Sequence, residues 1–120
     1  MIKSFEEITP ELTDFEKDVL LPVMVNGLSK KIGVKNVINN KQMKQGLLNS
    51  GYKVSDVRIR KLIHYIRVNQ LVKNLIANSK GYFIATNKEE VENFVESLQQ
   101  RINSIETVKH SFIKYLNNEN

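Results

Sequence analysis

A regular repeat of apolar side chains near the C-terminus constrains the fold more than any other feature of this sequence. From Val91 to Leu116, apolar residues recur at alternating spacings of four and three, and Lys109 is the one polar residue in the series. This heptad spacing places the whole series along one side of an α-helix. Asn87 is a favourable N-cap, so we expect one long helix over residues 88–116.

The predicted helix needs a partner for its apolar side. About 29 residues at 1.5 Å each give a length of roughly 43 Å, of which a small domain covers only part. We therefore expect a coiled coil that makes the protein a homodimer or a larger homo-oligomer. The alternative is a helix that bends or packs back on the first helix of the same chain. The predicted oligomerisation residues are Val95, Leu98, Ile102, Ile105, Phe112 and Leu116.

Charge is distributed unevenly along the chain. Residues 1–18 and 89–120 are acidic, whereas residues 19–88 hold thirteen lysines and arginines against a single acid, Asp56. A concentrated cationic segment is typical of a surface that binds a polyanion such as DNA. The alternative is a basic, solvated surface that binds nothing.

The acidic N-terminal part predicts a first helix. Thr9-Pro10-Glu11 is typical of a helix start, because threonine caps and proline suits the first turn. Pro22 should kink or split this helix, since it cannot donate a backbone hydrogen bond. Gly33 is a natural stop.

A short helix is predicted next, after a connector with a short strand at Val37-Ile38. Asn39 or Asn40 caps this helix, and Gly51 ends it. Gly46 lies in its middle, where glycine is about 1 kcal/mol less favourable than alanine. A close helix crossing would explain the glycine.

The centre of the chain predicts a third helix followed by a hairpin. Ser55 caps the helix, and its apolar residues fall at i, i+3, i+4 and i+7, which makes one buried stripe: Ile59, Leu62, Ile63 and Ile66. Two β-prone runs, 75–77 and 82–85, then flank a turn at residues 78–81 with Lys80 at its tip.

This order of elements is that of a winged helix-turn-helix domain. We predict a mainly α fold with a small β-hairpin. The domain covers residues 1–87, of which 1–8 form an N-terminal arm, and the long, coiled-coil-like helix covers 88–120.

The later helix of a helix-turn-helix enters the DNA major groove, and here that helix is predicted over residues 55–69. Arg58, Lys61 and Tyr65 lie near one line on it and are the predicted contacts to base edges. The remaining predicted contacts are to phosphates, with Lys80 touching either the backbone or the minor groove: Ser55, Arg60, His64, Arg67, Lys80, Lys41, Lys44 and Lys53.

The stretch from Asn39 to Thr86 resembles small winged-helix DNA-binding proteins of phages and prophages. The likeness lies in the N-K-x-M helix start, the run R-x-R-K-L-I at Arg58–Ile63, I-R-V-N at Ile66–Asn69 and S-K-G-Y-F-I-A-T at Ser79–Thr86. It implies the winged-helix fold and DNA binding. It also implies DNA contacts by Arg58, Arg60 and Lys61, and a wing turn at Lys80-Gly81.

Several classes of function find no support. The chain has no cysteine, and its two histidines, His64 and His110, lie on separate predicted helices without metal-ligand spacing. No phosphate-binding glycine loop, nucleophile elbow or HExxH motif occurs. We therefore predict a protein that is not an enzyme, with no cofactor, no metal and no small-molecule substrate. The polar N-terminus and the absence of a long apolar run predict a cytoplasmic protein of a bacterial host cell, without a signal peptide or membrane span.

Together these patterns predict a protein that binds double-stranded DNA, either as a transcriptional regulator or as a replication accessory factor of a phage or mobile element. The alternative is a winged-helix module that docks on a host or phage protein without sequence-specific DNA binding.

Overall fold

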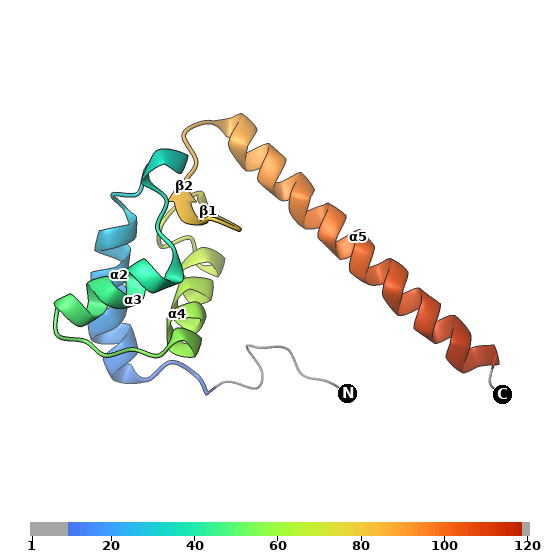
Figure 1. Cartoon of the computed structure of the whole chain (residues 1–120), viewed down its shortest axis with the longest axis horizontal. Coiled ribbons are helices and arrows are strands. Elements are labelled where there is room, and N and C mark those ends of the chain that lie inside the picture. The colour runs from blue at the N-terminus through green and yellow to red at the C-terminus, as the bar shows by residue number, and fades with distance from the viewer. Residues whose placement is uncertain (1–9, 119–120) are drawn as a thin grey trace. The chain divides into compact units, whose positions relative to one another are not determined.

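The computed structural model describes residues 10–118 and is mainly helical, with one two-stranded antiparallel sheet and a long C-terminal helix (Figure 1). This confirms the predicted fold class at that level. Contacts divide the chain into two units at the Thr86–Asn87 bond, and each is described by itself. The elements are η1 Glu16–Leu20, α2 Leu21–Leu28, η2 Val34–Asn36, α3 Asn40–Asn49, α4 Asp56–Val68, β1 Leu75–Asn78, β2 Gly81–Ile84 and α5 Lys88–Asn118.

The first helix begins later than predicted. Thr9 lies outside the described residues, and residues 10–13 are not helical. Thr13 caps the helix instead: its hydroxyl accepts a hydrogen bond from the Glu16 amide at 3.1 Å, and the Glu16 carboxylate accepts one from the Thr13 amide at 2.8 Å. This reciprocal pair is a capping box. It satisfies two amides, whereas Thr9-Pro10-Glu11 offered a single cap.

The same helix changes type just before its proline. Residues Glu16–Leu20 form a π-helical segment, and the Leu21 amide donates to the Glu16 carbonyl. Pro22 then lies in the first turn of α2, where its missing N–H is tolerated. The helix continues without a break from residue 14 to residue 28, so it is not split at Pro22; only its type changes just before the proline.

The core of the N-terminal unit lies between its three helices (Figure 1). The predicted stripe of α4 is buried: Ile59, Leu62 and Ile66 are fully inaccessible to solvent, and so is Leu28 of α2. The 3.6-residue repeat directs these side chains to one side of α4, where α2 and α3 cover them. The opposite side of α4 faces away from this core.

Helix α3 is capped as predicted, but Gly46 does not lie at the helix crossing that was expected there. Asn39 and Gln42 form a capping box, with bonds of 2.8 and 2.9 Å between each side chain and the other residue's amide. A Cβ atom added to Gly46 would meet nothing within 4 Å. The predicted close helix crossing at Gly46 is therefore wrong, because the glycine borders open space.

The hairpin is held against the connector that precedes α3. Strands β1 and β2 pair in antiparallel register, Leu75 opposite Ile84. On its other side β2 bonds to the connector: the amides of Ile38 and Tyr82 each donate to the other's carbonyl, at 3.0 and 2.8 Å. The predicted strand at Val37-Ile38 is thus a single bridge at Ile38.

Helix α5 begins where its cap predicts. The Asn87 side chain accepts a hydrogen bond from the Glu90 amide at 2.9 Å. The helix extends over 31 residues, none of them buried. The helix therefore lacks the buried apolar face from which most helices in proteins gain their stability.

Candidate nucleic-acid interface

Helices α3 and α4 contact each other and are joined by a tight turn at residues 50–55. Gly51 makes the turn possible with a φ of 93°, a conformation that residues with a Cβ rarely adopt. The Tyr52 amide then donates to the Leu47 carbonyl at 2.8 Å. Ser55 starts α4 by accepting a hydrogen bond from the Arg58 amide at 3.2 Å. The Ser55 hydroxyl oxygen is thus the helix cap, which is a structural role.

The solvent side of α4 carries part of the predicted contact set. Arg60 and His64 are exposed, Tyr65 is 37% exposed, and Arg67 is half-buried. All four lie away from the buried Ile59–Ile66 stripe because of the helical repeat. A cation, an imidazole and a phenol that are accessible on α4 can donate hydrogen bonds to phosphates or base edges.

Arg58 has a different setting from the one expected. Its Nε and Nη2 atoms donate to the two carboxylate oxygens of Glu16 at 2.8 and 2.6 Å, a bidentate ion pair. Nη1 and Nη2 also donate to the carbonyls of Pro10 and Glu11 at 2.7 and 3.0 Å. A guanidinium engaged in this way does not reach a base edge without breaking these bonds. Arg58 therefore ties the N-terminal segment to α4, which corrects its predicted role.

The Glu16–Arg58 pair has a measurable electrostatic signature. Hydrogen bonds from Arg58 lower the pKa of Glu16 from 4.5 to about 2, against a smaller opposing effect of burial. A carboxylate whose pKa is lower in the folded state than in the unfolded state stabilises the fold at pH values above its unfolded-state pKa. This stabilisation is lost as the pH falls through the folded-state pKa and the carboxylate is protonated.

We therefore expect the free energy of unfolding to fall between about pH 4.5 and pH 2 by roughly 3 kcal/mol on account of this group. Urea denaturation at a series of pH values measures the effect. Glu16→Gln should flatten the curve over this window, and an unchanged curve in that variant would contradict the assignment.

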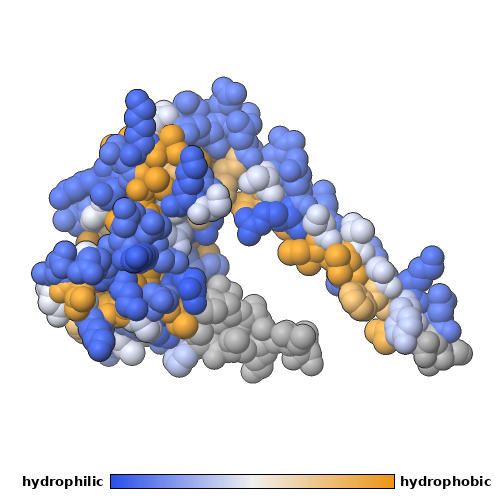
Figure 2. Space-filling model, in the orientation of Figure 1, coloured by the Kyte–Doolittle hydropathy of each residue, from blue (hydrophilic) through white to orange (hydrophobic). Residues whose placement is uncertain are grey.

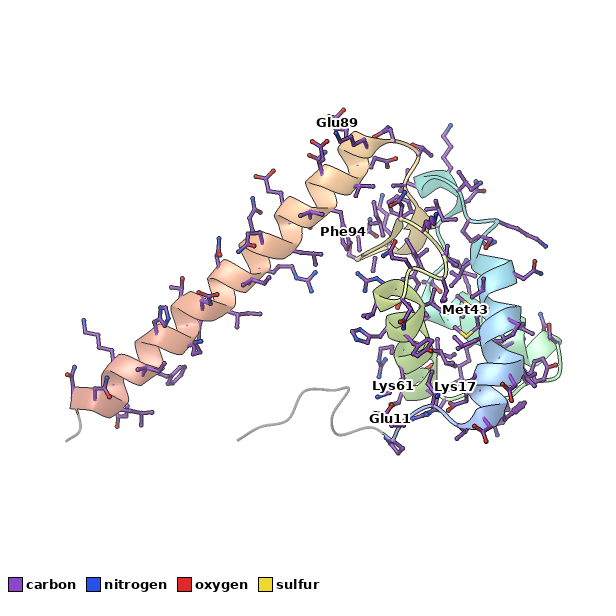
Figure 3. The ribbon with its side chains drawn as sticks, turned by 180° about the vertical axis from the view of Figure 1, so that it is seen from behind. Glu11, Lys17, Met43, Lys61, Glu89 and Phe94 are labelled. Atoms are coloured by element: carbon purple, nitrogen blue, oxygen red, sulfur yellow. The ribbon has the colours of Figure 1, made fainter. Side chains whose placement is uncertain are left out.

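Lys61 is also placed differently from the prediction. Only 7% of the residue is exposed, although it was expected on the outer face of α4. Figure 3 shows it toward the same end of α4 as Glu11 of the N-terminal segment. A buried ammonium group is not available to a base edge, so Lys61 leaves the contact set in this state of the protein.

The remaining predicted lysines lie on three neighbouring elements. Lys41 and Lys44 are on α3, Lys53 is in the turn, and Lys80 is at the hairpin tip; all are exposed. Lys44 forms an ion pair with Asp56 at 3.5 Å, and both side chains remain about half exposed. Such a solvated pair is weak and can exchange for a phosphate.

The hairpin is fixed close to the start of α3. The Tyr82 hydroxyl donates to the Asn40 side chain at 3.0 Å, beside the backbone bridge to Ile38. This contact brings the hairpin that carries Lys80 next to the α3 turn that carries Lys41. The two cations come from segments about forty residues apart in the sequence, so only the tertiary structure places them on neighbouring elements.

Sequence reasoning missed the apolar side chains on the outer face of α4. Val57 is 40% exposed and Val68 is 65% exposed. Their i, i+11 spacing puts both on the side opposite the buried stripe. This spacing could have predicted an apolar pair on the outer face of α4, but we assigned that face to the basic residues around the two valines.

Neither a metal site nor a membrane-spanning helix is found among residues 10–118. No group of three or more histidines, aspartates or glutamates lies close enough together to bind a metal ion. Over the same residues, every helix is too short or too polar to cross a bilayer. No known protein family, curated protein or solved structure matches the chain. The resemblance to phage winged-helix proteins therefore stays a prediction.

Proposed function

We propose that the N-terminal unit is a winged helix-turn-helix that binds double-stranded DNA, with α4 in the major groove and the β1–β2 hairpin as the wing. The supporting observation is that cations are exposed on three parts of this unit: Arg60 on α4, Lys53 in the turn before it and Lys80 at the hairpin tip. Thirteen basic residues against one acid over 19–88 supply the attraction to a polyanion.

The contact set for this proposal differs from the sequence-based one. Arg60 and Tyr65, both exposed on α4, replace Arg58 and Lys61 as the groups that approach base edges. Phosphates are contacted by side chains around it: Lys41, Lys44, Lys53, His64, Arg67 and Lys80. Within this proposal, the role is that of a transcriptional regulator or a replication accessory factor of a mobile element, as the sequence resemblance implies.

Binding to a short random duplex tests the proposal, by fluorescence anisotropy at several salt concentrations. We expect the affinity to fall steeply with salt, because each phosphate contact releases condensed cations. The triple variant Arg60→Ala, Lys53→Ala, Lys80→Ala should bind about 10- to 100-fold more weakly and reduce the salt slope by about two to three units.

Lys114→Ala is the matched control, because it removes an exposed cation of α5 far along the sequence from the site. It should change affinity by less than about twofold. Absence of DNA binding at low salt would rule out this surface as the DNA contact. So would a loss of DNA affinity per removed charge that is the same in the triple variant and in the control.

The second candidate is a protein-docking role for the same face. Val57 and Val68 favour it, because exposed aliphatic side chains among polar ones are typical of protein interfaces. Under this alternative Val68→Asp abolishes partner binding while DNA affinity is low and insensitive to the triple variant.

A further inference from the structure

Helix α5 has an apolar side whose large side chains are exposed to solvent. Its 31 residues span about 46 Å and include no buried side chain. Figure 2 shows hydrophobic residues gathered along one side of this helix. Ile105 is 68% exposed, and Phe112 is 66% exposed. Side chains of this size in such a row are normally covered by another helix.

The row follows a heptad, which identifies the positions that face a partner. The d positions are Val91, Leu98, Ile105 and Phe112, and the a positions are Val95, Ile102, Lys109 and Leu116. An a/d seam sustained over nearly four heptads is the pattern by which two identical helices pack side chains into each other's gaps.

The flanking positions distinguish between the possible directions of the partner. In a parallel, in-register pair, each g residue faces the e residue five positions later in the other copy. Arg101 then faces Glu106, and Val108 faces Ile113. Both pairs are complementary, one by charge and one by apolar character, and each occurs twice by symmetry.

An antiparallel pair loses this match. Full overlap of two antiparallel helices brings g residues opposite g residues and e opposite e. Arg101 then faces Val108, and Glu106 faces Gln99. Neither charge meets an opposite one, so the sequence of α5 favours the parallel arrangement.

Lys109 limits the number of helices. A single lysine at an a position lowers stability but selects register and oligomer state, because only the in-register dimer lets the charged ends reach water. A shifted pairing would place Lys109 against an apolar layer of the other copy. The same residue therefore opposes both slipped and larger assemblies.

From these features we infer that α5 binds a second copy of this chain as a parallel, in-register, two-stranded coiled coil. Each α5 begins directly after its N-terminal unit, so a parallel pair joins both units at the same end of the coiled coil. Two units at one end suit a ligand with two-fold symmetry. The inference rests on α5 alone and does not depend on DNA binding.

Cysteine cross-linking in the full chain tests the direction and register, since the natural sequence has no cysteine. Val95→Cys and Phe112→Cys each place a thiol at the seam, toward opposite ends of α5. Gln100→Cys is the matched control on the opposite side of the helix. In a glutathione redox buffer, each seam variant should form a disulfide-linked dimer with itself, and the control should stay largely reduced.

Other results of this experiment overturn the inference. An antiparallel pair would cross-link only in a mixture of the Val95→Cys and Phe112→Cys proteins. A monomer by sedimentation equilibrium at tens of micromolar, with no cross-link in either variant, would mean that α5 is covered by its own chain or stays uncovered. Trimer or tetramer masses would contradict the two-stranded assignment.

A charge exchange tests the Arg101–Glu106 pair separately. Arg101→Glu alone and Glu106→Arg alone each create two like-charge contacts in a parallel homodimer, so both should associate more weakly than the natural chain. Mixed together, the two variants regain opposite charges at both contacts and should form a heterodimer in preference to either homodimer. Statistical mixing would show that this pair does not form.

Discussion

Replacing Arg58 with alanine is expected to destabilise the N-terminal unit by roughly 3–5 kcal/mol. The substitution leaves the Glu16 side chain, only 10% exposed, without the guanidinium that bonds both carboxylate oxygens. It also removes the donors to the Pro10 and Glu11 carbonyls. Chemical denaturation followed by circular dichroism measures the loss.

Two further variants distinguish the loss of the Glu16–Arg58 ion pair from a general destabilisation by any substitution in α4. Arg60→Ala removes an exposed arginine from the same helix and should cost less than about 0.5 kcal/mol. The double variant Glu16→Met, Arg58→Met removes both charges and should be more stable than Arg58→Ala, because no buried carboxylate is left without a cationic partner. A cost for Arg58→Ala below about 1 kcal/mol would contradict the structural role.

The setting of Arg58 also affects how DNA-binding data are read. An Arg58→Ala protein that fails to bind DNA has lost part of its fold, so the failure would not identify a base contact. Arg60 provides the cleaner test, because its substitution leaves the Glu16 contact and the core intact.

Gly81→Ala is the second substitution with a large expected effect. Gly81 has a φ of 135°, and a Cβ atom there would lie 2.3 Å from the Ile38 carbonyl oxygen and 2.7 Å from its carbon. Both neighbours are backbone atoms, which cannot rotate away. We expect a loss of roughly 2–4 kcal/mol from backbone strain and from the broken contact between hairpin and connector.

Gly46→Ala is the matched control, since it makes the same chemical change inside α3. Apart from the backbone of its own helix, nothing lies within 4 Å of the added methyl group, so the variant should gain up to about 1 kcal/mol from helix propensity. Thermal unfolding of both proteins gives shifts of opposite sign. Equal shifts would mean that the close approach at Gly81 does not govern the effect.

Local patterns accounted for most of the elements. The caps at Asn39, Ser55 and Asn87 join residues three apart, and the stripe of α4 follows from one helical repeat. Such relations depend on a few neighbouring residues, so a sequence displays them directly. The late start of the first helix escaped prediction because Thr9-Pro10 and Thr13 both suit a helix start.

The candidate interface was only partly predictable for a related reason. The lysines of α3, the turn and the hairpin tip are exposed, as any lysine is by default. Arg58 and Lys61 carry the same charge and lie on the same helix, yet one is paired and the other buried. Helical position alone could not separate them from Arg60.

The sequence by itself determined where most of the helices and both strands of the hairpin form, where charge accumulates and which side of α5 is apolar, because these properties arise between residues within a few positions of each other. The tertiary structure alone decided which cations remain accessible. Glu16 and Arg58 are 42 positions apart, and Ile38 meets Tyr82 across a similar separation. Contacts at that range depend on how the whole unit packs, and a single sequence carries no local mark of them.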